Sequence, residues 1–232
     1  MPEKILVVDD GKDICEILEF NLTNEGYDVD IAHSAEEAWR KLTPEHSLIL
    51  LDVMMEGMSG YKLSEKLRKS NNFIPIIFLT AKDRENDILT GFSVGGDDYI
   101  SKPFSVKEVI ARIKALLKRS AIANKTNQSE NKKNCLVFDH VIIDLDAKEL
   151  TVNENIIPLT RTEFDIITLL ASNPSKVFER DEIIDHVWKD SPYITERTID
   201  VHIRRLRKKI GEKVSLIISR PGYGYRFNEK PL

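Results

Sequence analysis

Acidic residues that directly follow apolar runs are the residues of this chain best suited to chemistry. The run KILVV is followed by Asp9 and Asp10, and the run LILL is followed by Asp52. The second run lies between Pro44 and two glycines and is uncharged, which is typical of a strand buried on both faces. Asp52 is therefore predicted at a strand's carboxyl end, where the crevice of an open α/β sheet binds ligands. A turn or helix-cap role is the simpler interpretation of one such aspartate alone.

Two further strand ends would bring a hydroxyl and an ammonium group to the same edge. Thr80 ends the run IIFLT, and Lys102 follows YIS. Converging carboxylates repel each other unless a cation joins them, and hard oxygen ligands at an open site suit Mg²⁺. The metal and the ammonium would neutralise a phosphoryl group in transfer, a hydroxyl would hydrogen-bond to it, and a carboxylate would be the nucleophile. The four strand ends together predict a phosphoryl-accepting site.

The elements that must position these residues alternate strictly through the first half of the chain. Strands are predicted at residues 4–8, 28–32, 48–51, 76–79 and 99–101. Helices are predicted at residues 12–25, 35–42, 61–69, 87–94 and 106–119. Strict alternation of strand and helix predicts a doubly wound parallel α/β sheet with helices on both faces.

The composition is that of a soluble globular protein. The 232 residues are 41% hydrophobic, and no apolar run approaches the ~18 residues of a membrane span. The first residues lack a signal-peptide pattern, and two cysteines are too few to suggest a disulfide or metal framework. We therefore expect a cytoplasmic protein with no membrane association.

A polar segment divides the chain into two halves of different charge. Residues 1–119 carry 21 acidic and 16 basic side chains, whereas residues 120–232 carry 17 and 18. Between them, residues 120–134 contain almost no bulky apolar side chain, which predicts a flexible linker. The predicted domains are therefore 1–119 and 135–232, and their charges indicate different partners.

Four motifs in the first half resemble the receiver domain of two-component response regulators. They are VVDD at 7–10, LLDVMMEGMSG at 50–60, FLTAK at 78–82 and DDYISKPF at 97–104. The resemblance implies a flavodoxin-like five-stranded fold in which Asp52 accepts phosphate from a partner sensor histidine kinase. It also implies a ligand set for Mg²⁺: Asp10, Asp52 and the backbone carbonyl of Met54 directly, and Asp9 through a water.

The same resemblance assigns roles at the other strand ends. Lys102 and Thr80 would contact the phosphoryl group, and Tyr99 would rotate inward when Thr80 is pulled toward the phosphate. Glu56 stands where this family usually has proline, which leaves the loop after Asp52 less constrained and affects the expected lifetime of the phosphoryl group.

The second half has the order of a winged helix-turn-helix. Strands are predicted at 141–143, 150–152 and 156–159, helices at 160–172, 181–188 and 196–210, and a hairpin at 214–219 and 225–227. The 196–210 helix has an apolar stripe that is predicted to be buried: Ile199, Ile203, Leu206 and Ile210.

The opposite face of the 196–210 helix suits a DNA major groove. It carries Thr198, Val201, Arg205 and Lys208, flanked by Arg197 and Arg204. Arginine can fork to a guanine edge, valine can touch a thymine methyl, and flanking cations can neutralise phosphates. A solvated basic face is the alternative interpretation. The neighbouring hairpin favours DNA, because Arg220 and Arg226 lie beside a glycine-rich tip that could reach a minor groove.

Three motifs of the second half resemble the effector domain of the OmpR/PhoB subfamily of response regulators. They are RTEFDIITLLASNPSKVFERDEIIDHVW, RTIDVHIRRLRKKI and GYGYRF. The resemblance implies regulation of transcription from double-stranded promoter DNA, with a recognition helix in 195–210 and RNA polymerase facing the loop 189–194. The predicted DNA contacts are Arg197, Thr198, Val201, His202, Arg204, Arg205, Lys208, Arg220 and Arg226.

The subfamily resemblance also implies a homodimer that forms on phosphorylation and binds direct-repeat DNA. The residues predicted to form ion pairs across this dimer are Asp97, Asp98, Lys107, Glu108 and Arg112. Exposed pairs contribute only about 0–1 kcal/mol each, so dimerisation without phosphate is expected to be weak.

Two other functions remain to be weighed against a phosphate-switched regulator. A hydrolase of the haloacid-dehalogenase type would also place a nucleophilic aspartate after a buried strand, but that class usually needs a second acid where Met54 stands. A regulator that binds DNA regardless of phosphate is the third hypothesis. We expect no enzyme activity beyond phosphotransfer and slow autodephosphorylation at Asp52.

Overall fold

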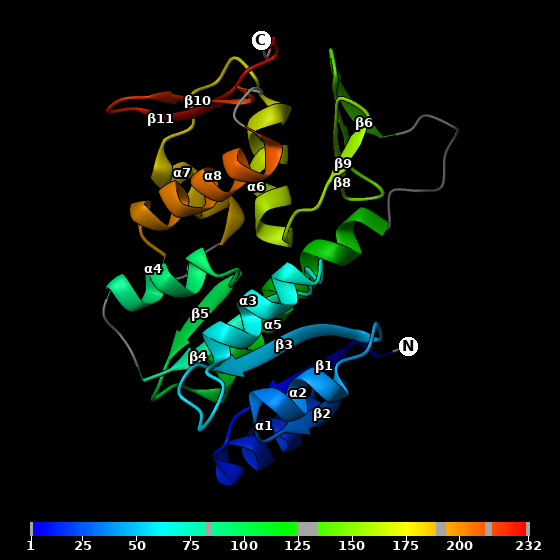
Figure 1. Ribbon diagram of the computed structural model, residues 1–232, viewed down its shortest axis with the longest axis vertical. Helices are drawn as coiled ribbons and strands as arrows, with labels where there is room; N and C mark the ends of the chain where they lie inside the picture. Colours follow the sequence, from blue (N-terminus) through cyan, green and yellow to red (C-terminus); the bar gives the residue numbers. More distant parts are fainter. Residues whose placement is uncertain (1, 82–84, 125–133, 189–193, 212–214, 231–232) are drawn as a thin grey trace. The chain divides into compact units, whose positions relative to one another are not determined.

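The computed structural model describes residues 2–81, 85–124, 134–188, 194–211 and 215–230, and its side chains except at 85–88 and 118–124. The chain divides into two compact units, Met1–Lys118 and Arg119–Leu232 (Figure 1). Within the described residues, no helix is both long enough and apolar enough to cross a membrane.

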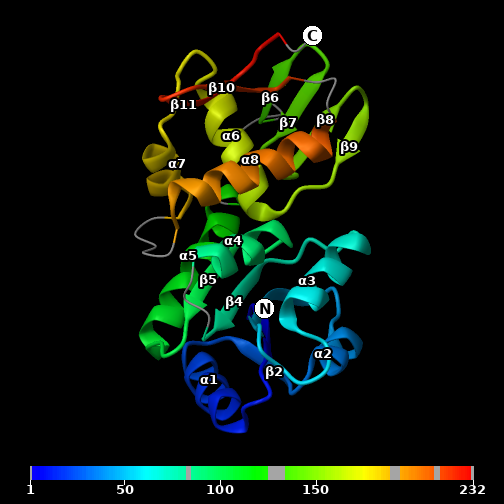
Figure 2. The same cartoon turned by 60° about the vertical axis from the view of Figure 1, so that its left-hand side comes forward.

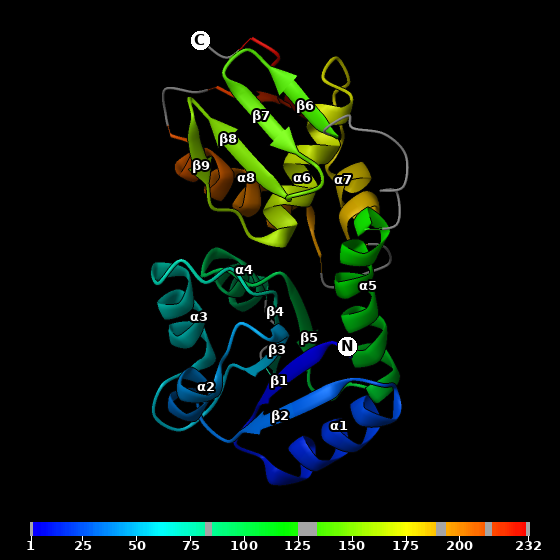
Figure 3. The same cartoon turned by 90° about the vertical axis from the view of Figure 1, so that its right-hand side faces the viewer.

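The described part of the first unit is built on one parallel sheet with strand order β2-β1-β3-β4-β5. Its strands are β1 (Lys4–Val8), β2 (Asp28–Ala32), β3 (His46–Asp52), β4 (Ile76–Thr80) and β5 (Asp98–Ser101). Its helices are α1 (Lys12–Asn24), α2 (Ala35–Lys41), α3 (Gly60–Lys69), α4 (Glu85–Ser93) and α5 (Val106–Asn124). Figure 3 shows α1 and α5 on one side of the sheet and α2 and α3 on the other. The predicted flavodoxin-like fold is confirmed.

The three central strands form the core of this unit. Nearly every residue of β1, β3 and β4 is buried, as their unbroken apolar runs predict for strands covered on both faces. On the α1 and α5 side, the strands pack against Leu18, Leu22, Val109 and Ile113. This packing fixes the strand ends that carry the candidate site.

Helix α5 differs from the sequence prediction at its end. It continues to Asn124, so the first five residues of the predicted linker 120–134 are helical. Ala121 and Ala123 favour this extension, since alanine has the highest helix propensity. The linker prediction rests instead on their lack of apolar bulk. Residues 125–133 of the predicted linker lie outside the described residues.

The second unit begins with an antiparallel sheet. Its strands are β6 (Cys135–Phe138), β7 (Val141–Asp144), β8 (Glu149–Val152) and β9 (Asn155–Ile157), paired in that order. The sequence analysis did not assign β6 as a strand, because its four residues lack a clear alternation. The sheet is seen face-on in Figure 3.

Three helices and a hairpin complete the second unit. They are α6 (Arg161–Ser172), α7 (Arg180–Val187), α8 (Glu196–Ile210), β10 (Ile217–Arg220) and β11 (Gly224–Phe227). Helix α8 crosses α6 with the hairpin nearby (Figure 2). The predicted stripe Ile199, Ile203, Leu206 and Ile210 is buried, so the predicted winged helix-turn-helix is confirmed.

Backbone pairing with the α6–α7 connection fixes the hairpin. Phe178 and Tyr225 exchange two backbone hydrogen bonds of 2.8 and 3.0 Å. Gly224 has a φ of +128°, and a Cβ there would lie 2.0 Å from the Phe178 carbonyl oxygen. Only glycine permits this close backbone approach.

Candidate functional site

Two buried carboxylates and one ammonium group meet at the carboxyl edge of the parallel sheet. Asp9 follows β1, Asp52 ends β3, and Lys102 follows β5. The Lys102 Nζ lies 2.6 Å from Asp9 Oδ2 and 2.8 Å from Asp52 Oδ1. Both aspartates are almost fully buried, whereas Asp10 is exposed. The predicted convergence of strand ends therefore occurs, with the lysine bridging the two acids.

The bridge determines the protonation of its members. Burial raises the pKa of the Asp52 carboxyl above its ordinary value, although the hydrogen bond from Lys102 acts in the opposite direction. Burial lowers the pKa of Lys102, but hydrogen bonds to Asp52 and Asp9 outweigh it, so its pKa is raised overall. Lys102 is therefore cationic at neutral pH and neutralises part of the charge of the acid pair.

Backbone amides complete the cradle around the acids. Met54 N–H donates to Asp52 Oδ2 at 2.8 Å, and Gly11 N–H donates to Asp9 Oδ1 at 2.9 Å. These bonds orient each carboxylate so that its second oxygen faces Lys102. The sequence motifs identified the acids but gave no signal for these amide donors.

Thr80 and Tyr99 lie on the neighbouring strands. Thr80 is fully buried, and its backbone carbonyl accepts the Lys102 N–H at 2.6 Å. Tyr99 is also fully buried, with its hydroxyl 3.4 Å from that of Tyr61 and its ring beside Phe78. The predicted switch tyrosine is thus in an inward position in this structure.

The donor set at this edge fits a hard divalent cation. No group of three His, Cys, Asp or Glu side chains gathers as a metal cluster within the described residues. Mg²⁺ does not need one, because it takes one or two carboxylates together with waters and phosphate. The oxygens of Asp9 and Asp52 already converge on a cationic group, with Asp10 next in the chain.

Gly60 allows α3 to begin directly against the carboxyl end of β3. A Cβ at this position would lie 2.2 Å from the Asp52 carbonyl oxygen and 3.1 Å from Leu51 Cγ. We expect Gly60→Ala to lower the free energy of unfolding by ~1–3 kcal/mol, the usual cost of overpacking, as measured by urea denaturation of the full chain. Exposed Glu65 on the same helix provides a control, because Glu65→Ala should change stability by less than about 0.5 kcal/mol. Equal effects of the two substitutions would contradict this packing.

Helix α8 presents a basic surface that is narrower than the sequence predicted. Arg197, Arg204 and Lys208 are exposed, and Val201 and Arg205 are half-buried. Thr198 and His202 are instead buried. They lie beside the apolar stripe, where the helical repeat keeps positions 198 and 202 on the packed side.

The two buried residues have structural contacts. The Thr198 hydroxyl accepts the N–H of Thr195 at 3.3 Å in the cap of α8, and the His202 ring lies 5.3 Å from that of Trp188. Burial lowers the pKa of His202 well below its ordinary value, so this ring is neutral. Direct DNA contact was predicted for Thr198 and His202, but it requires exposed side chains, and both side chains are buried.

The hairpin adds cations beside the end of α8. Arg220 is exposed, and Arg226 is half-buried. A concave region of about 620 Å³ lies between the end of α8 and the start of the hairpin. It is lined by Arg204, Arg207, Lys208, Gly211, Ser215, Leu216 and Ile217. Anionic ligands are favoured at such a surface.

Comparisons with known proteins match both halves of the chain. Residues 5–114 match the family described as response regulator receiver domain, and residues 153–227 match transcriptional regulatory protein, C terminal. The transcriptional regulatory protein ResD of Bacillus subtilis is 40% identical over 97% of this chain and 95% of its own. The chain belongs to the OmpR/PhoB family of response regulators.

Other relatives and solved structures agree with this family. The transcriptional regulatory protein SrrA of Staphylococcus aureus is 36% identical over 99% of this chain and 97% of its own. The solved response regulator DrrB, a Thermotoga maritima OmpR/PhoB homolog, is 29% identical with a TM-score of 0.52, covering 98% of this chain and 99% of that one. The solved structure of a RitR mutant gives a TM-score of 0.75 at 26% identity, with 98% and 100% coverage.

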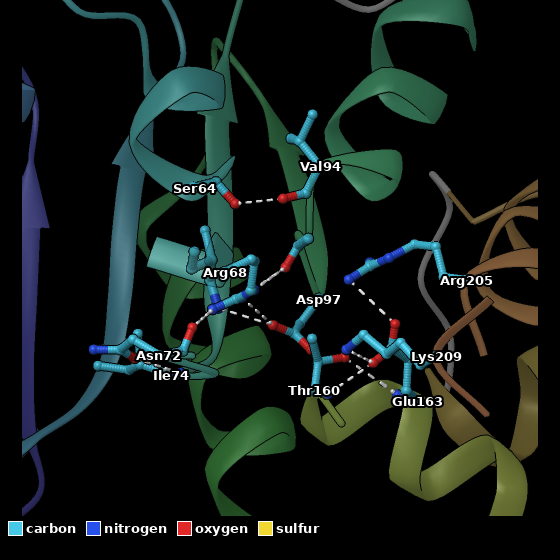
Figure 4. A network of polar contacts seen from close by, with 12 residues as sticks. Ser64, Arg68, Asn72, Ile74, Val94, Asp97, Thr160, Glu163, Arg205 and Lys209 are labelled. Carbon is cyan, nitrogen blue, oxygen red and sulfur yellow. Dashed lines mark hydrogen bonds and ion pairs between the residues drawn. The ribbon is translucent and has the colours of Figure 1, made fainter. Parts of the chain in front are cut away.

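Four of the five residues predicted for the dimer of this response regulator, Asp97, Asp98, Glu108 and Arg112, form ion pairs within one chain. Arg112 lies 3.2 Å from Asp98 and 3.0 Å from Glu108. Asp97 is fully buried and accepts the Ile76 N–H at 3.1 Å, with an Arg68 nitrogen 3.4 Å away (Figure 4). A dimer that pairs these groups across subunits would have to exchange such contacts, and Lys107 is the exposed member of the set. The dimer interface stays a prediction.

The structure of this response regulator also reveals residues that the sequence analysis missed. Cys15 donates to the Asp9 carbonyl at 3.3 Å, and burial raises the pKa of its thiol to about 11, which favours the protonated thiol at neutral pH. In the second unit, an Arg207 nitrogen donates to the Ile217 carbonyl and to the Ser219 hydroxyl, both at 2.9 Å. This arginine joins α8 to the hairpin, a long-range role that helix periodicity does not reveal.

One predicted contact could not be placed. The loop 189–194, predicted to face RNA polymerase, lies outside the described residues except for Ile194.

Proposed function

We propose that this response regulator is phosphorylated on Asp52 by a sensor histidine kinase in the cytoplasm and then acts on promoter DNA as a dimer. The observation that carries the proposal is the bridge from Lys102 to the buried acids Asp9 and Asp52 at 2.6 and 2.8 Å. A buried carboxylate beside a fixed cation combines a nucleophile with charge stabilisation for an arriving phosphoryl group.

The proposed transfer uses the side chains at the carboxyl edge of the parallel sheet. The Asp52 oxygen attacks phosphorus while the bond from phosphorus to the donor breaks, and the electron pair of that bond leaves with the donor. Lys102 neutralises charge on the phosphoryl oxygens, and the Thr80 hydroxyl donates a hydrogen bond to one of them. Mg²⁺, held by Asp9, Asp10, Asp52 and the Met54 carbonyl, would supply further charge neutralisation when bound.

Phosphoryl incorporation from acetyl phosphate tests this function and separates it from a hydrolase. The full-length protein should take up one acid-stable, base-labile phosphoryl group in the presence of Mg²⁺ and little after chelation by EDTA. Release of phosphate should be slow, without repeated turnover of the donor. Rapid multiple turnover would favour the haloacid-dehalogenase type of hydrolase instead.

The proposed output is regulation of transcription through contacts with DNA and RNA polymerase. Helix α8 would enter the major groove of double-stranded promoter DNA, with Arg205 at a base edge and Arg204 and Lys208 at phosphates. Arg220 and Arg226 would approach the minor groove from the hairpin. The exposure of Arg204, Lys208 and Arg220 supports these roles.

Substitutions at Arg205 and Lys208 should differ in kind. Arg205→Ala is expected to cost about 1–3 kcal/mol on a specific half-site and to relax the preference at one base pair. Lys208→Ala is expected to weaken specific and random DNA alike and to flatten the salt dependence by roughly one counterion. Fluorescence anisotropy at several salt concentrations measures both effects. If Arg205→Ala lowered the affinity for all DNA sequences equally, Arg205 would have no part in base recognition.

A further inference from the structure

A fully buried glutamate lies behind the proposed recognition helix. Glu163 is the third residue of α6 and has no exposed surface. Its Oε2 accepts the backbone N–H of Thr160 at 2.8 Å and lies 2.6 Å from Lys209 Nζ. Its Oε1 lies 3.1 Å from a guanidinium nitrogen of Arg205 (Figure 4). One buried carboxylate thus contacts two cations of α8 and the start of α6.

The two oxygens of Glu163 have different tasks. Oε2 completes the capping box of α6, in which the Thr160 hydroxyl also accepts the Glu163 N–H. A capping box needs only an acceptor, and glutamine provides one. Oε1 adds nothing to the cap, but it places negative charge against Arg205. A buried charge is costly unless it is paired, so the ion pairs explain why a carboxylate is held there.

The contact with Glu163 restricts the orientation of the Arg205 guanidinium on the side that faces α6. Arginine has a planar head with several donors, so one edge can rest on a carboxylate while another meets a ligand. A long side chain that is held before binding loses less conformational freedom when it docks, which increases affinity and sharpens geometry. The side chain of Arg205 is only 15% exposed, which agrees with such restriction.

We propose that Glu163 is a positioning residue for DNA sequence recognition, which holds Arg205 in the orientation that reads a base. The inference rests on the proposed function of Arg205 as the base-reading residue of α8. It assigns to a buried residue of α6, which cannot itself touch DNA, a part in choosing the DNA sequence.

The test uses Glu163→Gln in the full-length protein. The probe is a duplex half-site selected from random-sequence DNA by the unsubstituted protein, together with duplexes that carry each base-pair substitution in turn. Glutamine keeps the acceptor for Thr160 when its oxygen takes the place of Oε2, and its NH₂ group then faces Arg205, where it cannot hold a cation. Discrimination should fall at least about fivefold at the base pair that Arg205→Ala also relaxes, with little change elsewhere.

The chain offers a matched control in the capping box of α7. Glu182 is the third residue of α7, accepts the Glu179 N–H at 3.0 Å and pairs with Lys176 at 2.9 Å. Glu182→Gln therefore removes a carboxylate charge at the same position of a capping box, together with its pairing to Lys176, without touching Arg205. It should leave base discrimination unchanged. Far-ultraviolet circular dichroism and thermal unfolding of both variants report whether the caps remain intact.

A double variant shows whether Glu163 affects base discrimination through Arg205 or through a general effect on DNA binding. If Glu163 acts through Arg205, adding Glu163→Gln to Arg205→Ala should cause no further loss of discrimination. If Glu163→Gln fails to fold, Glu163→Asp keeps the charge and shortens the side chain, and it should give a smaller loss at the same base pair.

The outcomes are distinguishable. Equal weakening on all sequences, or tighter binding on release of Arg205, would overturn the positioning role of Glu163 while leaving base reading by Arg205 intact. If Arg205→Ala itself relaxes no position, the proposed function of Arg205 fails, and the inference fails with it.

Discussion

Asp52→Asn should abolish phosphoryl uptake from acetyl phosphate. Asparagine keeps the shape of the side chain, and its oxygen can still accept the Met54 N–H, but an amide is no nucleophile. The half-buried ammonium of Lys102 keeps Asp9 as a partner at 2.6 Å, so the fold should survive the substitution. Intact-protein mass spectrometry after incubation with acetyl phosphate and Mg²⁺ should show the unsubstituted protein modified and the variant unmodified.

Asp10→Asn is the matched control for this loss. It removes one carboxylate from the proposed metal ligands, but the nucleophile remains. Uptake should therefore fall and recover as the Mg²⁺ concentration is raised, whereas no Mg²⁺ concentration should restore uptake in Asp52→Asn. Stoichiometric base-labile phosphate on the Asp52→Asn protein would show that the nucleophile lies elsewhere.

The first unit was largely predictable because its signals are local. Each central strand is an unbroken apolar run followed at once by a chemically active residue, as at Asp9 and Asp52. Parallel topology then brings all strand ends to one edge, so sequence order alone predicts the meeting of these acids with Lys102. The direct bridge by the lysine was not predictable, since its distances to the two acids depend on side-chain packing.

The errors arose where side chains far apart in sequence decide the outcome. Periodicity placed Thr198 on the outer face of α8, and the structure buries it with His202 beside Trp188. The helical repeat predicts Arg205 on the DNA-reading face opposite the apolar stripe, but Glu163 on α6 also lies against it. No spacing rule within one helix reveals a partner on another helix, so the width of the basic surface was overestimated.

The end of α5 shows a different limit. Polarity and lack of bulk predict a flexible linker from residue 120, but helix propensity acts on the same residues. Ala121 and Ala123 cannot pack a core, yet they extend a helix that is already nucleated at a small cost. The helix therefore runs to Asn124.

Phosphorylation should tighten binding to two half-sites far more than to one. If phosphorylation acts by pairing the receiver domains, the free energy of dimerisation increases DNA affinity only where two effector domains bind to the same duplex. Direct repeats spaced by about one helical turn, ~10–10.5 base pairs, allow two such domains to bind the same face of the duplex. Allosteric couplings are typically about 1–3 kcal/mol, so the expected gain is roughly 5–150-fold on the repeat and less than about twofold on a single half-site.

A control removes the switch without changing the DNA-binding surface. The Asp52→Asn protein treated with acetyl phosphate should bind both duplexes as the untreated unsubstituted protein does. Sedimentation velocity on the same samples should show a higher mass for the phosphorylated protein only. A gain in affinity without any change in mass would separate DNA binding from dimerisation.

The central claim is that Asp52 controls DNA binding through assembly, and one comparison tests it most directly. Binding titrations of the full-length protein on duplexes with one and with two half-sites, before and after phosphorylation, give four dissociation constants. If Asp52 acts through assembly, the dissociation constant should be much lower only for the phosphorylated protein on the duplex with two half-sites. Equal tightening on both duplexes would contradict it and would mean that the receiver releases the recognition helix within a single chain.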